Sequence, residues 1–444
     1  MSARPPTPMV ATAAGAALLA IAVRVNNAVR YPPDWGFDAS FNWRYIYRMA
    51  NDWALPHPSA GWSTADPPLF FTAAAALMAA SGFRVSLVPL FNSALGLAIV
   101  AMAMLLVRDA QPERPLRCLL AGGLLLYLPA HIQMSAMASE EMLSAFFISA
   151  AVFLLARRSP GRAGSLPRAA AVGLATGLGL LTKLTSAVAG VTAVGTYVLD
   201  GSRQRAMRPA LTAVAAVFAV ALLTGGWYYA RNHAIYGSLQ PFGLPAHQVM
   251  FEMPPGERSV GDYLRFPAST FTDPQLLDPD LLRSVWGSTY ATVWFDGHRF
   301  FLPRDVASVS RLGSVCLALA LLPTAAFGAG LLRGLRRCAR GDGAPDLPLL
   351  MLVAMSFAGY AVYTWQNPWF AVVKGTSLLG LSLPFAYYTS EELDRWIRRG
   401  PGAAAAIGAG LAALAFAVIL STTFNFAFEK TEISGLPWQA AGDR

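Results

Sequence analysis

The chain has 444 residues, of which 55% are hydrophobic and only 13% are charged, and its formal net charge is +9. Soluble proteins carry about a quarter charged residues, so this composition excludes an ordinary soluble domain and indicates an all-α polytopic membrane protein. In such a protein a positive net charge reflects orientation and attraction to anionic lipid rather than binding of nucleic acid. The three cysteines form no CxxC pair, so neither a disulfide framework nor a zinc site is indicated.

Apolar segments near the length that a bilayer requires, roughly 20 residues, predict eleven transmembrane helices. The predicted spans are 9–29, 87–107, 116–134, 141–156, 169–182, 184–199, 209–229, 311–332, 347–366, 369–389 and 402–423. The first is expected to be an uncleaved helix, because no strong signal-peptide cleavage site follows it. Residues 69–81 are apolar but short and follow two prolines, which predicts a helix lying in the membrane interface.

The arginines divide the connecting segments into two sets. Seventeen of them lie in five short connections, at 108–117, 157–168, 201–208, 333–346 and 390–400. The two long connections, 30–68 and 230–310, hold nine between them. The positive-inside rule therefore predicts a cytoplasmic N-terminus, with both long loops and the C-terminus outside. The predicted parts are a membrane module at 1–229 with a first outer loop at 30–86, an outer loop at 230–310, membrane helices at 311–423 and an outer tail at 424–444.

Carboxylates near the outer ends of the spans are the first candidate site residues. Asp38 lies among aromatic residues just after the first span, where it could act as a general base, although a solvated Asp or the cap of a helix near Ala39 explains it equally well. Glu140 and Glu141 precede the fourth span, where acids suit a helix start. Consecutive helical residues point about 100° apart, so we expect at most one of them to face a cavity. A carboxylate facing inward, with Glu141 preferred, could bind a divalent cation or an ammonium group, and His131 could join it as a second ligand.

Basic residues in apolar surroundings are the second set of candidates. The chain has only three lysines, and two of them, Lys183 and Lys374, interrupt apolar sequence. A charged ammonium within a span costs at least about 2.5 kcal/mol, so these residues are expected to bind a lipid phosphate on the outer side, with snorkelling as the alternative. Arg231 follows Trp227-Tyr228-Tyr229 and could clamp a phosphate with two hydrogen bonds, or simply belong to an interfacial aromatic belt.

The two outer loops also contain features with open interpretations. Trp35 and Trp43, with other aromatic residues of the first loop, could stack on sugar rings or belong to the packing. The segment 237–304 is too long to lack structure and is expected to form either an acceptor-binding lid or a cap on the bundle. The sequence shows no P-loop, dinucleotide-binding glycine motif, HExxH or nucleophile elbow, so no site for a soluble nucleotide is visible.

Several of these segments, in order from about residue 10 to residue 388, resemble the GT-C superfamily of membrane glycosyltransferases. The resemblance is to the branch of protein O-mannosyltransferases and lipid A aminoarabinose transferases. The matching features are Asp38 after the first helix, "PPLFF" at 67–71, "SEEMLSAFF" with Glu141, "LLTKLTS" with Lys183, "WYYARNHAIYGS" with Arg231 and Asn232, and Lys374-Gly375. The chain departs from the family pattern at Ala39, where a second acid is common, and at Asp66, where a His is common.

The resemblance implies a GT-C-like bundle with interfacial helices and a long outer loop. It also implies a hexosyl- or pentosyltransferase that uses a polyprenyl-phosphate sugar as donor and a glycan, lipid or protein as acceptor, with inversion. Asp38 would be the base, and Glu141 would assist it, with a divalent metal ion as the candidate cofactor. The residues expected on the donor phosphate are Lys183, Arg231 and Lys374, and those expected on substrate are Trp35, Trp43, Asp66, Tyr229 and Asn232.

The composition and the family together favour a bacterial inner membrane. The alternative function is a lipid-linked sugar flippase or other transporter without transferase activity. A transporter is expected to carry charged or helix-breaking residues deep in several spans, and the inner halves of the predicted spans contain few of them. A membrane protein that only binds polyprenyl lipid is the third possibility, which a substitution of Asp38 would leave unaffected.

Overall fold

The computed structural model describes residues 7–157, 165–241, 253–276, 278–341 and 345–430. Parts of the predicted outer loop (242–252) and of the predicted outer tail (431–444) lie outside these residues. Within the described ranges the regular secondary structure is entirely helical. The expectation of an all-α fold is therefore confirmed.

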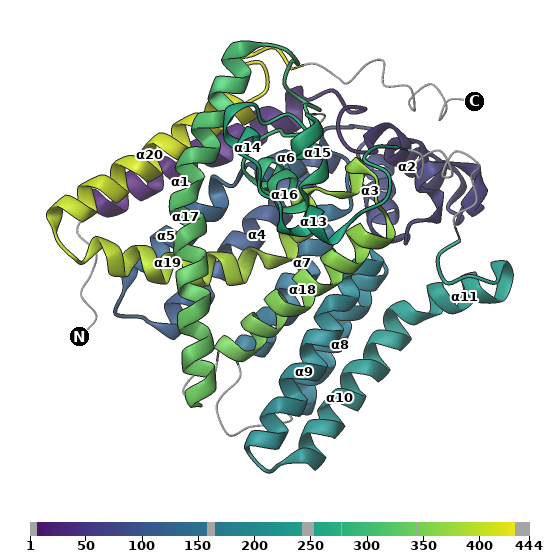
Figure 1. Cartoon of the computed structure of the whole chain (residues 1–444). Helices are drawn as coiled ribbons and strands as arrows, with labels where there is room; N and C mark the ends of the chain where they lie inside the picture. Colours follow the sequence, from purple (N-terminus) through teal and green to yellow (C-terminus); the bar gives the residue numbers. More distant parts are fainter. Residues whose placement is uncertain (1–6, 158–164, 242–252, 277, 342–344, 431–444) are drawn as a thin grey trace.

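Long and medium helices form a bundle that is capped at one end by short ones (Figure 1). The bundle contains α1 (Thr7–Arg30), α4 (Leu87–Ala110), α5 (Pro115–Leu126), α6 (Pro129–Ser135), α7 (Glu141–Ala156), α8 (Leu166–Leu180), α9 (Ala187–Arg203), α10 (Met207–Ala221), α11 (Trp227–Tyr236), α17 (Ala307–Arg340), α18 (Asp346–Gln366), α19 (Ser382–Ile397) and α20 (Pro401–Thr422). The capping helices are α2 (Ala39–Asp52), α3 (Leu69–Ala80), α13 (Val260–Leu264), α14 (Ser269–Thr272), α15 (Pro279–Arg283) and α16 (Val285–Trp294).

Among the described residues, seven helices are long and apolar enough to cross a membrane, or eight if the bent pair α5 and α6 is counted as one span. Each of the eleven predicted segments contains helix, but α7 and α8 have only 16 and 15 residues. The predicted count of eleven spans is therefore not confirmed. Residues 69–80 form the short apolar helix α3, whose side chains Phe70 and Phe71 are fully buried.

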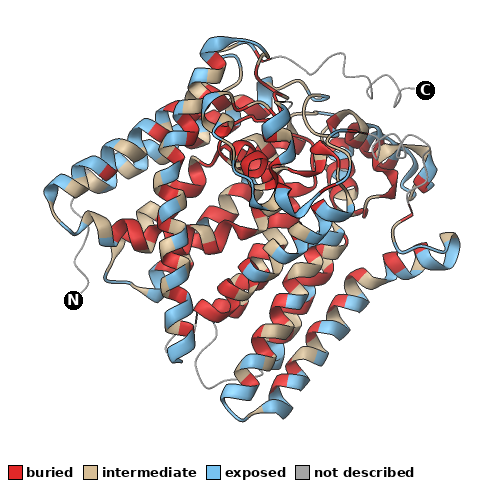
Figure 2. Ribbon diagram, viewed as in Figure 1, coloured by how far each residue is buried: buried red, intermediate tan, exposed pale blue. Residues whose placement is uncertain are grey.

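The outward faces of the bundle are apolar, as lipid contact requires. Figure 2 shows buried residues concentrated between the helices and in the capping layer, while α1, α10 and α20 present exposed faces. Large hydrophobic side chains occupy these faces, including Leu18, Leu211, Phe218, Leu223 and Phe416. Exposed apolar surface on this scale is typical of helices that face hydrocarbon.

Contacts between the ends of helices show which segments share the capped end. Nδ2 of Asn27, near the end of α1, donates to the carbonyl of Thr422 at 2.9 Å, so α1 and α20 end together. Nδ2 of Asn92, near the start of α4, donates to the carbonyl of Ser139 just before α7 at 2.9 Å. The Phe37 ring packs against the Phe300 ring at a centroid distance of 4.4 Å, which joins the first long loop to the second.

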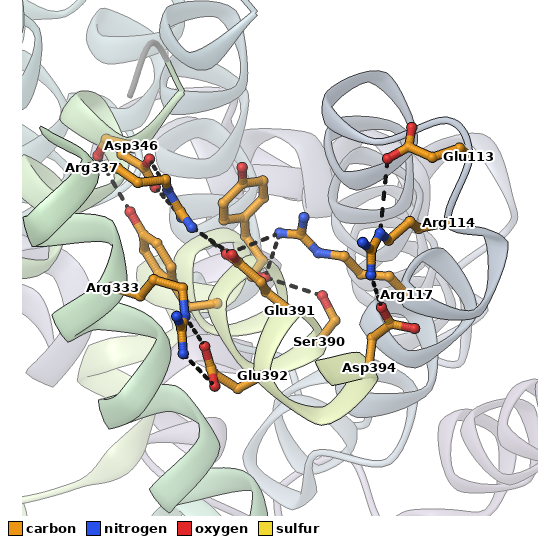
Figure 3. Close-up of polar contacts among 12 residues, drawn as sticks. Glu113, Arg114, Arg117, Arg333, Arg337, Asp346, Ser390, Glu391, Glu392 and Asp394 are labelled. Carbon is orange, nitrogen blue, oxygen red and sulfur yellow. Dashed lines mark hydrogen bonds and ion pairs between the residues drawn. The ribbon is translucent and has the colours of Figure 1, made fainter. Parts of the chain in front are cut away.

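The opposite end of the bundle holds a network of ion pairs (Figure 3). Arg337 on α17 pairs with Asp346 at the start of α18, with N–O distances of 2.8 and 2.9 Å. It also pairs with Glu391 on α19, and Arg333 pairs with Glu392. The predicted loop 333–346 is wrong in its first part, because α17 continues through Arg340. These side chains lie on helices, where the pairing compensates their burial.

Candidate active site

Asp38 occupies the N-cap position of α2 in the left-handed region, with φ of 54°. Its carboxylate makes no capping hydrogen bond, and the residue is exposed. Only its backbone carbonyl serves the helix, accepting from the N–H of Asn42 at 2.9 Å. The capping alternative therefore does not describe the side chain, whose carboxylate remains available for chemistry.

Lys183 brings the two neighbouring glutamates together. Its Nζ lies 2.8 Å from Oε1 of Glu140 and 2.9 Å from Oε1 of Glu141. The expectation that at most one glutamate faces a shared cavity is wrong. Glu140 is the N-cap of α7 and its backbone already lies in the helical region, so the two glutamate side chains leave the helix start in different directions and converge on the single ammonium of Lys183.

Electrostatic interactions keep both Glu140 and Lys183 charged. Burial alone would raise the pKa of Glu140, but the charge and hydrogen bond of Lys183 lower it. Burial alone would lower the pKa of Lys183, but the carboxylates of Glu140 and Glu141 raise it well above its usual value. The structure therefore contains an ammonium held between two carboxylates at the start of α7.

Lys374 connects Glu141 to the segment that contains Asp38. Its Nζ lies 3.9 Å from Oε1 of Glu141 and 4.8 Å from the centroid of the Phe37 ring, which directly precedes Asp38. The next residue, Gly375, donates its N–H to Oγ1 of Thr292 on α16 at 2.7 Å. A cation over an aromatic face is attracted to it, so Lys374 links α7, α16 and the segment before α2.

Asp66 lies between the 3-10 helix Trp62–Ala65 and α3, and its position is fixed from two sides. The Tyr228 hydroxyl donates to its carbonyl at 3.1 Å, and the N–H of Leu69 donates to the carbonyl of Leu181 at 2.8 Å. Burial and the negative charge of Glu140 raise the pKa of the Asp66 carboxyl to about 8. Asp66 therefore lies within electrostatic range of the glutamate pair.

Arg231 lies on α11, at the side of the site that carries Asp66. Its charge acts on Tyr45, which also feels the charge of Asp66. Its Nη1 donates to Oδ1 of the buried Asn232 at 3.2 Å. The hydroxyl of Tyr229 donates to the carbonyl of Leu180 at 2.7 Å, so this residue anchors α11 to the end of α8.

The remaining predicted residues lie apart from this cluster. Trp43 is buried and donates its indole N–H to the Pro33 carbonyl, so packing describes it. Trp35 packs edge-on against Tyr31, with ring centroids 6.0 Å apart. His131 is fully buried in α6, with Nδ1 3.5 Å from Nη2 of Arg24.

The side chains that could bind a metal ion give little support to the predicted metal site. Within the described part of the chain, no group of three or more His, Cys, Asp or Glu side chains is placed to hold a metal ion. Nζ of Lys183 occupies the position between the Glu140 and Glu141 carboxylates where a cation would bind. His131 contacts Arg24 instead of these carboxylates. The residues present therefore do not fit a divalent ion.

The sequence leaves open whether Glu140 or Glu141 faces the site, and in the structure both pair with Lys183. Tyr363, near the end of α18, feels the charges of Lys183, Glu141, Asp38 and Asp66. No sequence pattern pointed to it, because its neighbours in the site lie far away in the chain.

Comparison with known proteins shows what part of the chain and its fold resemble. Residues 62–231 match the family model of dolichyl-phosphate-mannose-protein mannosyltransferase, a range that includes Asp66, Glu141, Lys183 and Arg231. The chain also shares the fold of ArnT from Cupriavidus metallidurans in the apo state. That likeness covers 94% of this chain and 76% of ArnT, at 15% sequence identity and a TM-score of 0.53. The resemblance to GT-C membrane glycosyltransferases is confirmed.

Other solved structures align over most of the chain at lower similarity. The Archaeoglobus fulgidus oligosaccharyltransferase in its apo form has 14% identity and a TM-score of 0.47, over 93% of this chain and 55% of that one. ArnT bound to undecaprenyl phosphate has 15% identity and a TM-score of 0.45, over 89% and 82% of the two chains. No curated protein matches by sequence. The matching domain and the shared fold support a membrane glycosyltransferase.

Proposed function

We propose that this GT-C protein transfers a sugar from a polyprenyl-phosphate carrier to an acceptor hydroxyl. The observation that carries the proposal is one cluster of charged side chains at the capped end of the bundle, inside and beside the mannosyltransferase-like domain. Its members are Asp38, Asp66, Glu140, Glu141, Lys183, Arg231 and Lys374. The family description names a dolichyl-phosphate sugar, and the solved ArnT binds undecaprenyl phosphate. Both are lipid phosphates that diffuse in a membrane.

Asp38 is the proposed general base. It takes the proton of the acceptor hydroxyl while the oxygen attacks the anomeric carbon, and the bond from that carbon to the phosphate oxygen breaks. A single displacement of this kind inverts the anomeric configuration. The exposed carboxylate, which makes no capping hydrogen bond, can reach an acceptor that arrives from the aqueous side.

The leaving polyprenyl phosphate gains charge as the bond breaks, and basic side chains stabilise that charge. Arg231 and Lys374 are the proposed phosphate ligands, and Arg231 offers a planar, two-pronged donor. Lys183 was predicted to share this role. In the structure its ammonium is already paired with two carboxylates, so we propose that it holds Glu140 and Glu141 in place and supplies less charge to the phosphate.

The acceptor class and the membrane face are further parts of the proposal. A protein, a glycan or a lipid hydroxyl would serve the same chemistry. The excess of arginine in the short connections supports a cytoplasmic N-terminus and a site on the outer face, in a bacterial inner membrane. The segment between α11 and α17 would then approach the acceptor from outside the membrane. This segment includes α16, which contacts the residues next to Lys374.

Turnover of the purified protein in nanodiscs tests the function. A panel of polyprenyl-phosphate sugars is supplied, and release of polyprenyl phosphate is measured for the wild type and for Asp38→Asn. We expect release by the wild type and a loss of at least 10³-fold in the variant. Asp34→Asn, an exposed aspartate of the same loop, is the matched control and should keep full activity.

Two outcomes would contradict the proposal. Equal release by Asp38→Asn and the wild type would exclude Asp38 as the base. No release from any donor, together with saturable lipid binding by both proteins, would favour a transporter or a binding protein.

A further inference from the structure

A second polar site lies at the end of the bundle away from the glutamates and Lys183. A cavity of about 300 Å³ opens there between the end of α4, the start of α5 and the end of α19. It is lined by Gln111, Arg114, Glu391, Asp394, Arg395 and Arg398. Its volume is at the lower end of the range for small-molecule pockets, about 300–1,000 Å³.

The two carboxylates of this cavity are already neutralised. Oδ2 of Asp394 accepts from Nη1 of Arg114 at 2.9 Å and from Nε of Arg398 at 3.0 Å. Glu391 pairs with Arg337 from α17 and, at 3.6 Å, with Nη2 of Arg117. The acids therefore orient Arg114, Arg117 and Arg337 (Figure 3). Three arginines against two acids leave the lining of the cavity with an excess of positive charge.

Two arginines have unused hydrogen-bond donors. Arg395 lines the cavity, is exposed, and forms no ion pair with any described residue. Arg117 is 1% exposed, and its Nε and Nη1 have no hydrogen-bond partner within the described ranges. Burying an unsatisfied charged donor is costly. The helix dipoles give this site no net preference for anions or cations, because α4 and α19 end here while α5 and α20 begin here.

The position of the cavity indicates the source of a ligand. Arg395 lies in the last turn of α19 and Arg398 directly follows that helix, and α20 is apolar from its first turn onward. α17 has 34 residues, which corresponds to roughly 50 Å, so it extends beyond a hydrocarbon core of about 30 Å. Side chains near its end, such as Arg337, therefore lie at the depth of lipid headgroups.

We propose that this cavity binds the phosphate of a phospholipid headgroup in the leaflet opposite the candidate active site. Arg395 and Arg398 donate to the phosphate oxygens, and Gln111 donates to the ester oxygens. A guanidinium presents paired N–H groups that match phosphate geometry. The ion pair with Asp394 holds Arg398 in place before the lipid arrives.

Native mass spectrometry of the delipidated full-length protein tests the proposal. Phosphatidylglycerol is titrated into the wild type, into Arg395→Gln, and into Arg399→Gln, an exposed neighbour that does not line the cavity. We expect one tightly retained phosphatidylglycerol, bound about tenfold more weakly by Arg395→Gln and normally by Arg399→Gln. Equal retention by both variants would overturn the proposal.

Two further ligands, glycerol phosphate and phosphatidylcholine, test which chemical group the site recognises. Competition by millimolar glycerol phosphate would mean that the site takes a soluble phosphate, which overturns its assignment to a membrane lipid. Phosphatidylcholine should bind more weakly, because its quaternary ammonium meets the cationic rim of Arg395 and Arg398. Equal affinity for phosphatidylcholine and phosphatidylglycerol would also count against a charge-selected site.

Discussion

The ammonium of Lys183 and the carboxylate of Glu140 lie 2.8 Å apart, and this ion pair ties the end of α8 to the start of α7. The adjacent Glu141 shares the same cation at 2.9 Å. Lys183 is therefore the nearest base to both acids, and Lys374 lies farther away, at 3.9 Å from Glu141. The pairing predicts how the site responds to substitution, pH and ligand.

Replacing Lys183 by Met should destabilise the protein. Two carboxylates would lose their partner in a mostly buried site, and breaking a buried pair costs about 3–5 kcal/mol. Because the Lys183 side chain is 27% exposed, we expect about 2 kcal/mol. Denaturant unfolding in detergent micelles measures this change. The double variant Lys183→Met/Glu140→Gln should recover part of the loss, and unchanged stability of Lys183→Met would contradict the pairing.

Asp66 should make stability depend on pH. Because its pKa is raised to about 8, the folded state binds a proton that the unfolded state releases near pH 4, and stability falls as pH rises from about 4 to 8. Glu140 has a lowered pKa, so its contribution is lost only at lower pH, as the solution becomes more acidic. Asp66→Asn should flatten the decline between pH 5 and pH 8. An identical slope in both proteins would show that another group titrates there.

Arg231→Gln should reduce the rate of sugar transfer by about 10²-fold, because a donor to the developing phosphate charge is lost. Arg231→Lys keeps the charge but not the two-pronged geometry, and should recover only part of the rate. Steady-state kinetics with a polyprenyl-phosphate sugar measures both. Arg208→Gln serves as the control, since Arg208 is exposed at the start of α10, at the end of the bundle away from the site. Equal loss in the control would indicate a general electrostatic effect.

Arg337→Met should destabilise the opposite end of the bundle without altering the chemistry. Arg337 neutralises both Asp346 and Glu391, so its loss leaves two buried or nearly buried acids and should cost about 3 kcal/mol. The thermal midpoint should fall, whereas the kcat of the protein that remains folded should stay unchanged. Arg336→Gln, one residue away and exposed, should leave the midpoint unaltered. A change in kcat would reveal coupling between the two ends.

Much of the bundle could be predicted, because apolar runs, prolines and arginines mark helices directly. The sequence predicts helix in all eleven segments correctly. It does not predict which of them span a membrane, since α7 and α8 are shorter than a bilayer requires. The end of α17 was placed eight residues too early. Arg333 and Arg337 resemble loop residues in a hydropathy profile, although their partners on α18 and α19 stabilise them within the helix.

The candidate site could be predicted only in part. Asp38, Glu141 and Lys183 were found because a charge beside apolar sequence is conspicuous and because the family pattern contains them. Helical rotation favours only one of Glu140 and Glu141 and leaves open which one faces the site, whereas in the structure both carboxylates reach the ammonium of Lys183. Tyr363 shares no local pattern with the acids around it, and only tertiary structure reveals it.

The contact between Gly375 and α16 has a mechanical consequence. A β-carbon at Gly375 would lie 2.4 Å from the side chain of Val293, so backbone and helix move together at this point. The adjacent Lys374 rests on the ring of Phe37, and Phe37 is bonded to Asp38. α16 is therefore connected to the carboxylate of Asp38 on another loop through the contact with Gly375, the contact of Lys374 with Phe37, and the chain between Phe37 and Asp38. Such a linkage would let the arrival of one reactant set the position of the group that acts on it.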